Sequence, residues 1–99
     1  ENRKIWKVRA DAATKALRKE GFKFAAPQAP MYAFATHDCI ADAGKYAMRL
    51  LEEKGVAVAP GNDFGGFSKF VRITLNQKEE VLEEAIAKMG EGAKEWAKN

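Results

Sequence analysis

Residues 70–75 carry the pattern that most restricts how this chain folds, because the character of the side chain changes at every position. The aliphatic positions are Val71, Ile73 and Leu75, and the intervening positions are Phe70, Arg72 and Thr74. A period of two predicts a β-strand whose successive side chains point to opposite faces of a sheet. We expect the aliphatic face to pack under a layer of helices, which leaves Arg72 in the middle of the strand on the uncovered face.

Three segments show the spacing of apolar side chains that is typical of amphipathic helices. We predict these helices over residues 3–20 and 40–54 and from about residue 76 toward the C-terminal end. The expected apolar stripes are Ile5, Val8, Ala12 and Ala16 in the first helix, with Leu17 beside them, Ile40, Ala43, Ala47, Leu50 and Leu51 in the second, and Val81, Leu82, Ala85, Ile86 and Met89 in the third.

The ends of these helices also have sequence signals. Gly21 and Gly55 follow the first two helical patterns and are predicted to end them, since glycine readily takes the left-handed conformation of a helix C-terminus. Asn76 and Glu79 have the spacing of a capping box at the start of the third helix. The glycines within residues 90–92 are expected to weaken the end of that helix.

Short segments with strand patterns lie between the helices. They cover residues 22–24, 31–35, 56–59 and 70–75, with loops at residues 36–38 and 60–69, the first of which can supply a helix cap. The order α-β-β-α-β-β-α predicts an α+β fold. We expect a two-layer sandwich, with one small, mostly antiparallel sheet and helices packed on one of its faces.

Composition and charge narrow the class of protein. The 99 residues fit one domain, and the formal net charge of +3 is spread through mixed acidic and basic runs. A nucleic-acid-binding domain would gather its basic residues on one face, so we expect no nucleic-acid partner. No apolar run approaches the roughly 20 residues of a membrane-spanning helix, and Cys39 is the single cysteine. These features predict a soluble, cytoplasmic domain without a disulfide or a thiolate metal site.

Arg72 is the strongest candidate for a binding residue. Its guanidinium group is a planar fork of donors that suits a carboxylate or a phosphate. From the pattern alone, however, the favoured interpretation is a surface arginine that pairs with a nearby carboxylate. The glycines of the loop Pro60–Gly66 would let its backbone approach a ligand, but the loop lacks the Lys-Ser/Thr pair of a Walker loop. An ordinary connection between two strands is the alternative there.

Other chemically interesting residues do not form a site in the sequence. His37, Asp38 and Cys39 are adjacent, but one histidine and one cysteine are too few for a metal site, so we interpret them as part of a capping loop. Trp6 and Trp96 are interpreted as core or interface residues. No paired carboxylates stand out. The residues by themselves therefore predict neither a catalytic site nor a metal site.

Two long motifs resemble a known family. Residues 55–65 (GVAVAPGNDFG) followed by residues 70–74 (FVRIT) resemble the signature of class I/II aminotransferases, G-V-x-V-x-P-G-x-x-F-G and then x-V-R-[IL]-[ST]. Residues 27–34 (PQAPMYAF) are similar to the P-x-G-A-[FM]-Y-x-F segment of that family, with Ala29 and Pro30 in place of its usual Gly-Ala. The similarity is collinear and covers nearly the whole chain.

The resemblance implies a specific place in a larger enzyme. Residues 1–99 look like the C-terminal small domain of an aspartate-aminotransferase-like enzyme that depends on pyridoxal phosphate. Arg72 matches the position that binds the substrate α-carboxylate, and the loop Pro60–Gly66 would lie near the active-site mouth. In this family the catalytic lysine and the groups that hold the cofactor belong to the large domain. We therefore expect no catalytic, cofactor-binding or metal-binding residue in this chain.

The activity implied by the resemblance is amino transfer between an amino acid and a 2-oxo acid. The implied partners are those substrates, the enzyme's own large domain and a second copy in a homodimer, and no nucleic acid or membrane. The isolated domain is expected to be inactive. One alternative stays open, a stand-alone ferredoxin-like binding or regulatory module. A basic nucleic-acid-binding domain is a second alternative, which the scattered charges disfavour.

Overall fold

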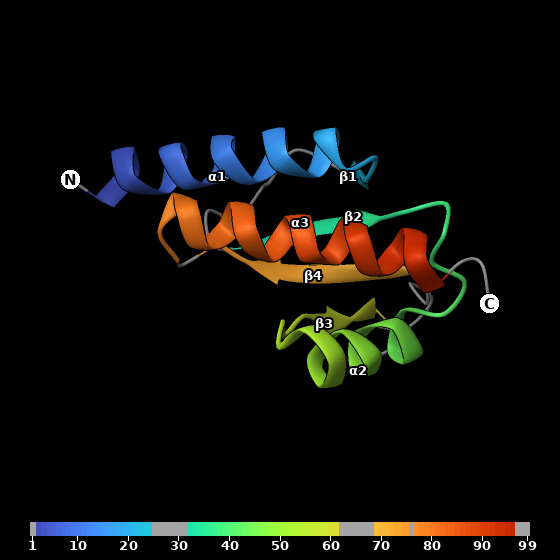
Figure 1. Cartoon of the computed structure of the whole chain (residues 1–99). Coiled ribbons are helices and arrows are strands. Elements are labelled where there is room, and N and C mark those ends of the chain that lie inside the picture. The colour runs from blue at the N-terminus through green and yellow to red at the C-terminus, as the bar shows by residue number, and fades with distance from the viewer. Residues whose placement is uncertain (1, 25–31, 62–68, 76, 97–99) are drawn as a thin grey trace.

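The computed structural model describes residues 2–24, 32–61, 69–75 and 77–96 (Figure 1). Within them, helices and strands follow the predicted order α-β-β-α-β-β-α. The elements are α1 (Asn2–Lys19), β1 (Lys23–Phe24), β2 (Tyr32–Thr36), α2 (Ala43–Lys54), β3 (Ala59–Pro60), β4 (Phe70–Thr74) and α3 (Glu79–Trp96). The predicted α+β fold is confirmed.

The strands form one antiparallel sheet in the order β1-β2-β4-β3. Strand β4 is an inner strand, with β2 on one edge and β3 on the other. Its central residue, Arg72, lies opposite Phe34 of β2 and opposite Ala59 of β3. Both edges of β4 are therefore paired at Arg72, which fixes the backbone of this residue between two neighbours.

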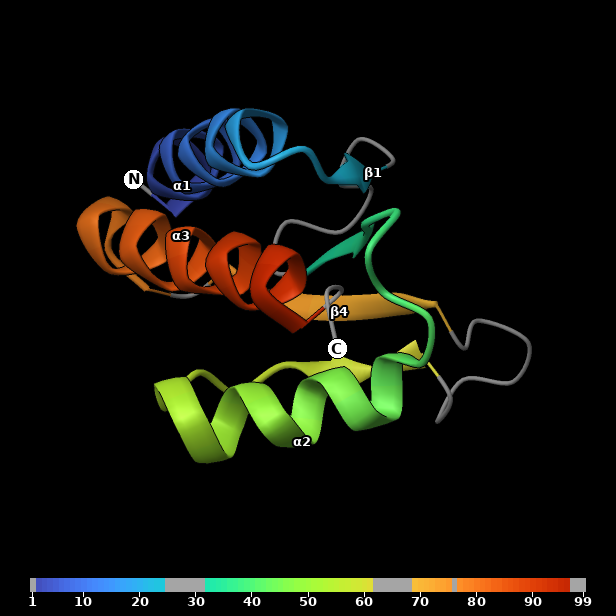
Figure 2. The same cartoon turned by 45° about the vertical axis from the view of Figure 1, so that its right-hand side comes forward.

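The core lies between the aliphatic face of the sheet and the helices. Helices α1 and α3 lie side by side in both views, and α2 lies next to β3 (Figure 2). Each of these helices contributes buried side chains to one cluster with the sheet. Its fully buried larger members are Leu17, Leu50, Val71, Leu75, Ile86 and Met89. The expectation that helices cover the face of Val71 and Ile73 is confirmed.

The apolar stripe predicted for the first helix is only partly correct. Ile5 and Val8 are 44% and 50% exposed, whereas Ala13 and Leu17 are completely buried. Two apolar stripes run next to each other along α1, and α1 uses the one that faces α3. Spacing alone does not distinguish two neighbouring stripes. In the other helices the expected core residues Leu51 and Val81 are likewise exposed.

Helix α2 begins at Ala43, three residues later than predicted, because Asp42 caps it. The Asp42 carboxylate accepts hydrogen bonds from the backbone N–H groups of Gly44 (2.9 Å) and Lys45 (3.2 Å). The loop at residues 36–38 does not provide this cap. At the other end, Gly55 has a φ of 69° and donates its N–H to the Leu51 carbonyl, so the predicted helix end is confirmed.

The strand predicted over residues 56–59 is shorter in the structure. Only Ala59 and Pro60 pair with β4. The N–H of Val56 donates to the Leu50 carbonyl at 3.4 Å, so the start of the segment is bonded to the end of α2 rather than to the sheet. The capping residue expected at Asn76 lies outside the described residues.

Helix α3 continues through Gly90 to Trp96, so the glycines do not end it. Gly90 is buried, and a Cβ atom at this position would lie 2.7 Å from Glu20 Cβ and 2.8 Å from Glu20 Cδ. The glycine therefore permits the close approach of α3 to the end of α1. Figure 1 shows the two helices running side by side in this region.

We expect Gly90→Ala to destabilise the protein by about 1–3 kcal/mol, because the added methyl group overpacks this helix contact. In an open helical position the same change would stabilise by about 1 kcal/mol. Urea unfolding of both forms measures the difference. The double variant Glu20→Ala/Gly90→Ala should recover part of the loss, since the crowding atoms Cδ and Oε1 of Glu20 are gone while Cβ stays. An increase in stability on Gly90→Ala alone would contradict this account of the contact.

Candidate functional site

Arg72 lies on the sheet face that points away from the helices, as predicted. Its neighbours in the strand, Val71 and Ile73, are buried in the core, so the alternation places Arg72 on the opposite face. Tyr32 and Phe34 of β2 share this face and are partly exposed. The Arg72 guanidinium carbon lies 4.6 Å from the centroid of the Tyr32 ring. The site is thus a cation among aromatic side chains.

This arrangement can bind an anion. An aromatic ring attracts a cation through its electron-rich face, which accounts for the contact between Tyr32 and Arg72. The guanidinium group carries its N–H donors in one plane. Two parallel N–H groups match the two oxygens of a carboxylate. The geometry around Arg72 therefore suits a carboxylate that approaches along the uncovered face.

The loop predicted near the site begins beside Arg72. Pro60 pairs with Val71, and Ala59 directly precedes it opposite Arg72. Gly61 is buried where the described part of the loop ends. Residues 62–68 lie outside the described residues, so the predicted role of the glycines at 65 and 66 remains a prediction.

His37 has a structural role at the end of α1. Its side chain is 9% exposed and makes an edge contact with the Phe22 ring. Nε2 donates to the Glu20 carbonyl oxygen at 3.1 Å, while Nδ1 accepts from the N–H of Cys39 at 3.0 Å. Both ring nitrogens are therefore engaged by the backbone, and His37 joins the loop before α2 to the last turn of α1.

Asp38 points to the surface instead. It forms an exposed ion pair of 3.0 Å with Lys23, which lowers the pKa of the Asp38 carboxyl group through a hydrogen bond and through charge. The described ranges contain no group of three or more His, Cys, Asp or Glu side chains able to hold a metal ion. The part of the chain that the structure describes also has no helix long and apolar enough to cross a membrane.

Trp96 packs at the junction of α2 and α3. Its ring contacts Tyr46 at 5.8 Å between centroids and lies under the Arg49 guanidinium at 4.7 Å. The Tyr46 hydroxyl donates to the Met89 carbonyl at 2.7 Å, and burial strongly raises the pKa of this tyrosine. The prediction that Trp96 is a core or interface residue agrees with this position. Trp6 of α1 is half-buried.

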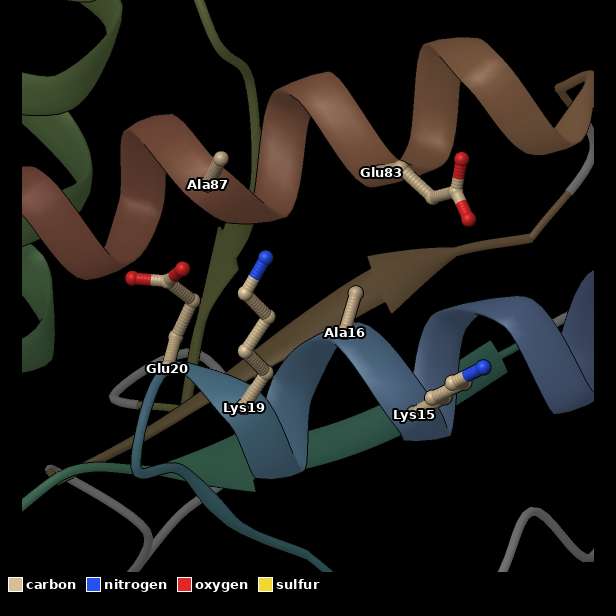
Figure 3. A pocket seen from close by; sticks show the side chains of 6 residues that line it. All are labelled: Lys15, Ala16, Lys19, Glu20, Glu83 and Ala87. Atoms are coloured by element: carbon tan, nitrogen blue, oxygen red, sulfur yellow. The ribbon is translucent and has the colours of Figure 1, made fainter.

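A groove of about 300 Å³ lies between α1 and α3, within the helix layer (Figure 3). The residues that line it are Lys15, Ala16, Lys19, Glu20, Glu83 and Ala87. Lys19 and Glu20 extend from α1 toward α3, and Glu20 also pairs with Lys94 at 3.5 Å. Acidic and basic groups alternate around the groove, and the sheet separates it from Arg72. It does not combine with Arg72 into one site.

The described lysines do not have the environment of a Schiff-base nucleophile, which needs a neutral amine in a desolvated pocket. Among the described lysines, Lys54 is the least exposed to solvent, with a side chain that is 14% exposed. It bonds to Glu91 at 2.7 Å, and this hydrogen bond raises the pKa of Lys54. Lys54 is therefore held in its charged form, and the other described lysines lie on exposed or half-exposed surface.

Comparisons with known proteins agree with the motifs. LL-diaminopimelate aminotransferase from Nitratidesulfovibrio vulgaris strain Hildenborough is 37% identical over 90 residues, which are 90% of this chain and 23% of that protein. The same enzyme from Oleidesulfovibrio alaskensis is 34% identical over the same shares. The chain thus spans about a quarter of the length of the curated relatives that it matches.

Solved structures give the same result. The aromatic aminotransferase of Pyrococcus horikoshii superposes with a TM-score of 0.85 at 32% identity, over 97% of this chain and 26% of that one. The aspartate aminotransferase of Thermotoga maritima gives a TM-score of 0.80 at 34% identity, over 89% and 23%. The sequence model of the family "Aminotransferase class I and II" matches residues 1–89. From this match and the shared fold, we conclude that the chain belongs to the class I and II aminotransferase family.

Proposed function

We propose that this chain is the substrate-clamping small domain of an aminotransferase that moves an amino group between an amino acid and a 2-oxo acid. The family match supports the reaction class, and the coverage of about a quarter of each relative supports a role as one domain of a longer enzyme. The other partners in this proposal are the enzyme's own large domain and a second copy in a homodimer.

The position of Arg72 in the sheet is the observation that supports this proposal most. Arg72 stands on an inner strand, which is held on both edges, and its guanidinium carbon lies 4.6 Å from the centroid of the Tyr32 ring. In the proposed role Arg72 binds the substrate α-carboxylate through two parallel hydrogen bonds. Such a bidentate contact fixes the plane of the carboxylate and therefore the direction of the adjoining Cα. Orientation of this kind lowers the entropy cost of reaching the transition state.

The family depends on pyridoxal phosphate, which supplies an electron sink when it is bound. The described residues of this chain do not fit that group, because their lysines are charged or exposed. We therefore assign to this chain only the binding and orientation of the substrate. The cofactor belongs, in this proposal, to parts of the full-length family members that the chain does not match.

The 99-residue chain should not form a stoichiometric aldimine when it is titrated with pyridoxal phosphate. Absorbance spectroscopy should show only the weak, non-saturating change that surface lysines give. Lys54→Met should titrate like the wild type, since Lys54 is occupied by Glu91. A saturable one-to-one absorbance band that disappears when a single lysine is substituted would overturn the assignment of the cofactor to another domain.

In the full-length enzyme, Arg72→Lys should lower kcat/KM for the amino-acid substrate by at least about tenfold. Lysine keeps the charge but lacks the planar fork, and loss of a desolvated charge-assisted pair costs about 2–5 kcal/mol. Steady-state kinetics measure the effect, and cofactor absorbance should be unchanged. Melting of the 99-residue chain should also change little, because Arg72 faces away from the core.

Arg49→Lys is the matched control for this experiment. Arg49 lies on α2 beside Glu53 and Trp96, in the helix layer rather than on the uncovered face. It should leave kcat/KM at the wild-type value. Wild-type kinetics for Arg72→Lys, or a large loss of stability in that variant, would show that Arg72 has a structural role instead.

A further inference from the structure

A groove of about 420 Å³ lies between α3 and the segment that joins α2 to β3. The first half of α3 and residues 55–58 both contribute to its wall, together with the end of β4. None of the described residues that line this groove carries a charge. Its larger apolar lining residues are Val56, Val58, Ile73, Val81, Leu82 and Met89.

Part of this apolar lining is open to solvent. Val81 of α3 is 47% exposed, and Ala57 on the other side is exposed as well. Small-molecule sites usually bring a few polar groups together to orient the ligand. The polar side chains of this lining, Thr74 and Gln77, are instead exposed. The groove therefore suits an apolar stretch of polypeptide better than a polar metabolite.

Residues 56–58 have the sequence of a strand but no strand partner among the described residues. Valine and alanine alternate over residues 56–59, and valine favours strands, yet the pairing with β4 begins only at Ala59. Strand β3 is also at the edge of the sheet, with β4 on one side only. An edge of this kind can accept a further extended segment. The unpaired strand pattern lies along the apolar groove.

The source of such a segment follows from the length of the relatives. The chain spans 23% of the LL-diaminopimelate aminotransferase of N. vulgaris and 26% of the aromatic aminotransferase of P. horikoshii. Most of each relative thus lies outside the matched region. Stable association between separate proteins involves about 20–30 residues on each side, more than line this groove. A covalently linked segment can bind to a smaller surface, because its effective concentration is high.

We propose that this groove is the docking site of an extended apolar segment from the rest of the full-length enzyme. The segment lies along residues 56–58 and buries its apolar side chains against Val81 and its neighbours on α3. The inference rests on the part of the proposed function in which the chain is one domain of a longer enzyme, and it does not depend on the role of Arg72.

Thiol labelling of the native full-length enzyme tests whether the groove is covered. Val81→Cys places a thiol in the groove, and Glu84→Cys places one outside it on the same helix, where the Glu84 side chain is 71% exposed. Both positions are exposed in the structure, so neither change removes a core side chain. N-ethylmaleimide should modify Val81→Cys at least about tenfold more slowly than Glu84→Cys, because the docked segment must first open. Peptide mass spectrometry resolves the two sites from other cysteines.

Two controls separate docking from local reactivity. In urea the two thiols should react at equal rates, and in the 99-residue chain, where the groove is open, their rates should differ by less than about threefold. Equal rates in the native full-length enzyme would overturn the proposal. A tenfold difference that persists in the 99-residue chain would do so as well, since the protection would then come from this chain itself.

Photo-crosslinking identifies the occupant of the groove. Val81 is replaced by a photoreactive aliphatic diazirine residue, and the full-length enzyme is irradiated. The adduct should have the mass of one chain and should join position 81 to a peptide outside residues 1–99. An adduct with the mass of two chains would show that a second copy fills the groove. That result, or the absence of an adduct within one chain, would overturn the proposal.

This proposal and the proposed function fail in different ways. If Val81→Cys is labelled as fast as Glu84→Cys while Arg72→Lys is impaired in kcat/KM, only the docking site is wrong. If Arg72→Lys has wild-type kinetics while the groove is covered by the enzyme's own chain, the role of Arg72 fails and the docking site stands.

Discussion

The pairing of β4 along both of its edges is the constraint on which the rest of the structure depends. Strands β2 and β3 bond to it from opposite sides, so its residues cannot rotate between the two faces of the sheet. Val71 and Ile73 then have to point into the helix layer, where they meet Leu17, Leu50 and Ile86. The same pairing directs Arg72 outward. The alternation of this one strand thus determines both which residues enter the core and which face of the sheet carries Arg72.

Part of this arrangement could be predicted because it is local. The alternation in residues 70–75 and the glycine at position 55 each determine their own backbone geometry, and both predictions are confirmed. The face that α1 buries could not be predicted in the same way. Ile5 and Val8 form one apolar stripe, while Ala13 and Leu17 belong to a neighbouring one. Only the position of α3 decides between them, and that is a tertiary property.

The candidate site also combines a local feature that the sequence predicts with a tertiary feature that it does not. Strand alternation predicts that Arg72 faces away from the helices. The contact between Tyr32 and Arg72 depends on the register between β2 and β4, which joins residues 40 positions apart. The sequence of either strand alone does not show how the two strands align with each other. The sequence prediction also misses Asp42 as the cap of α2, although an aspartate directly before the first residue of a helix is a recognisable signal.

The chemistry of Arg72 follows from where the strand places it. An inner β-strand is among the most rigid elements of a small domain, since hydrogen bonds hold both of its edges. A bidentate contact loses much of its value if the guanidinium moves by about an ångström. A surface loop would not hold it to that tolerance, whereas hydrogen bonds to β2 and β3 restrain the backbone of β4 on both edges. In the proposed role, an arginine held in this way would fix the direction from which the substrate carboxylate meets the reacting group.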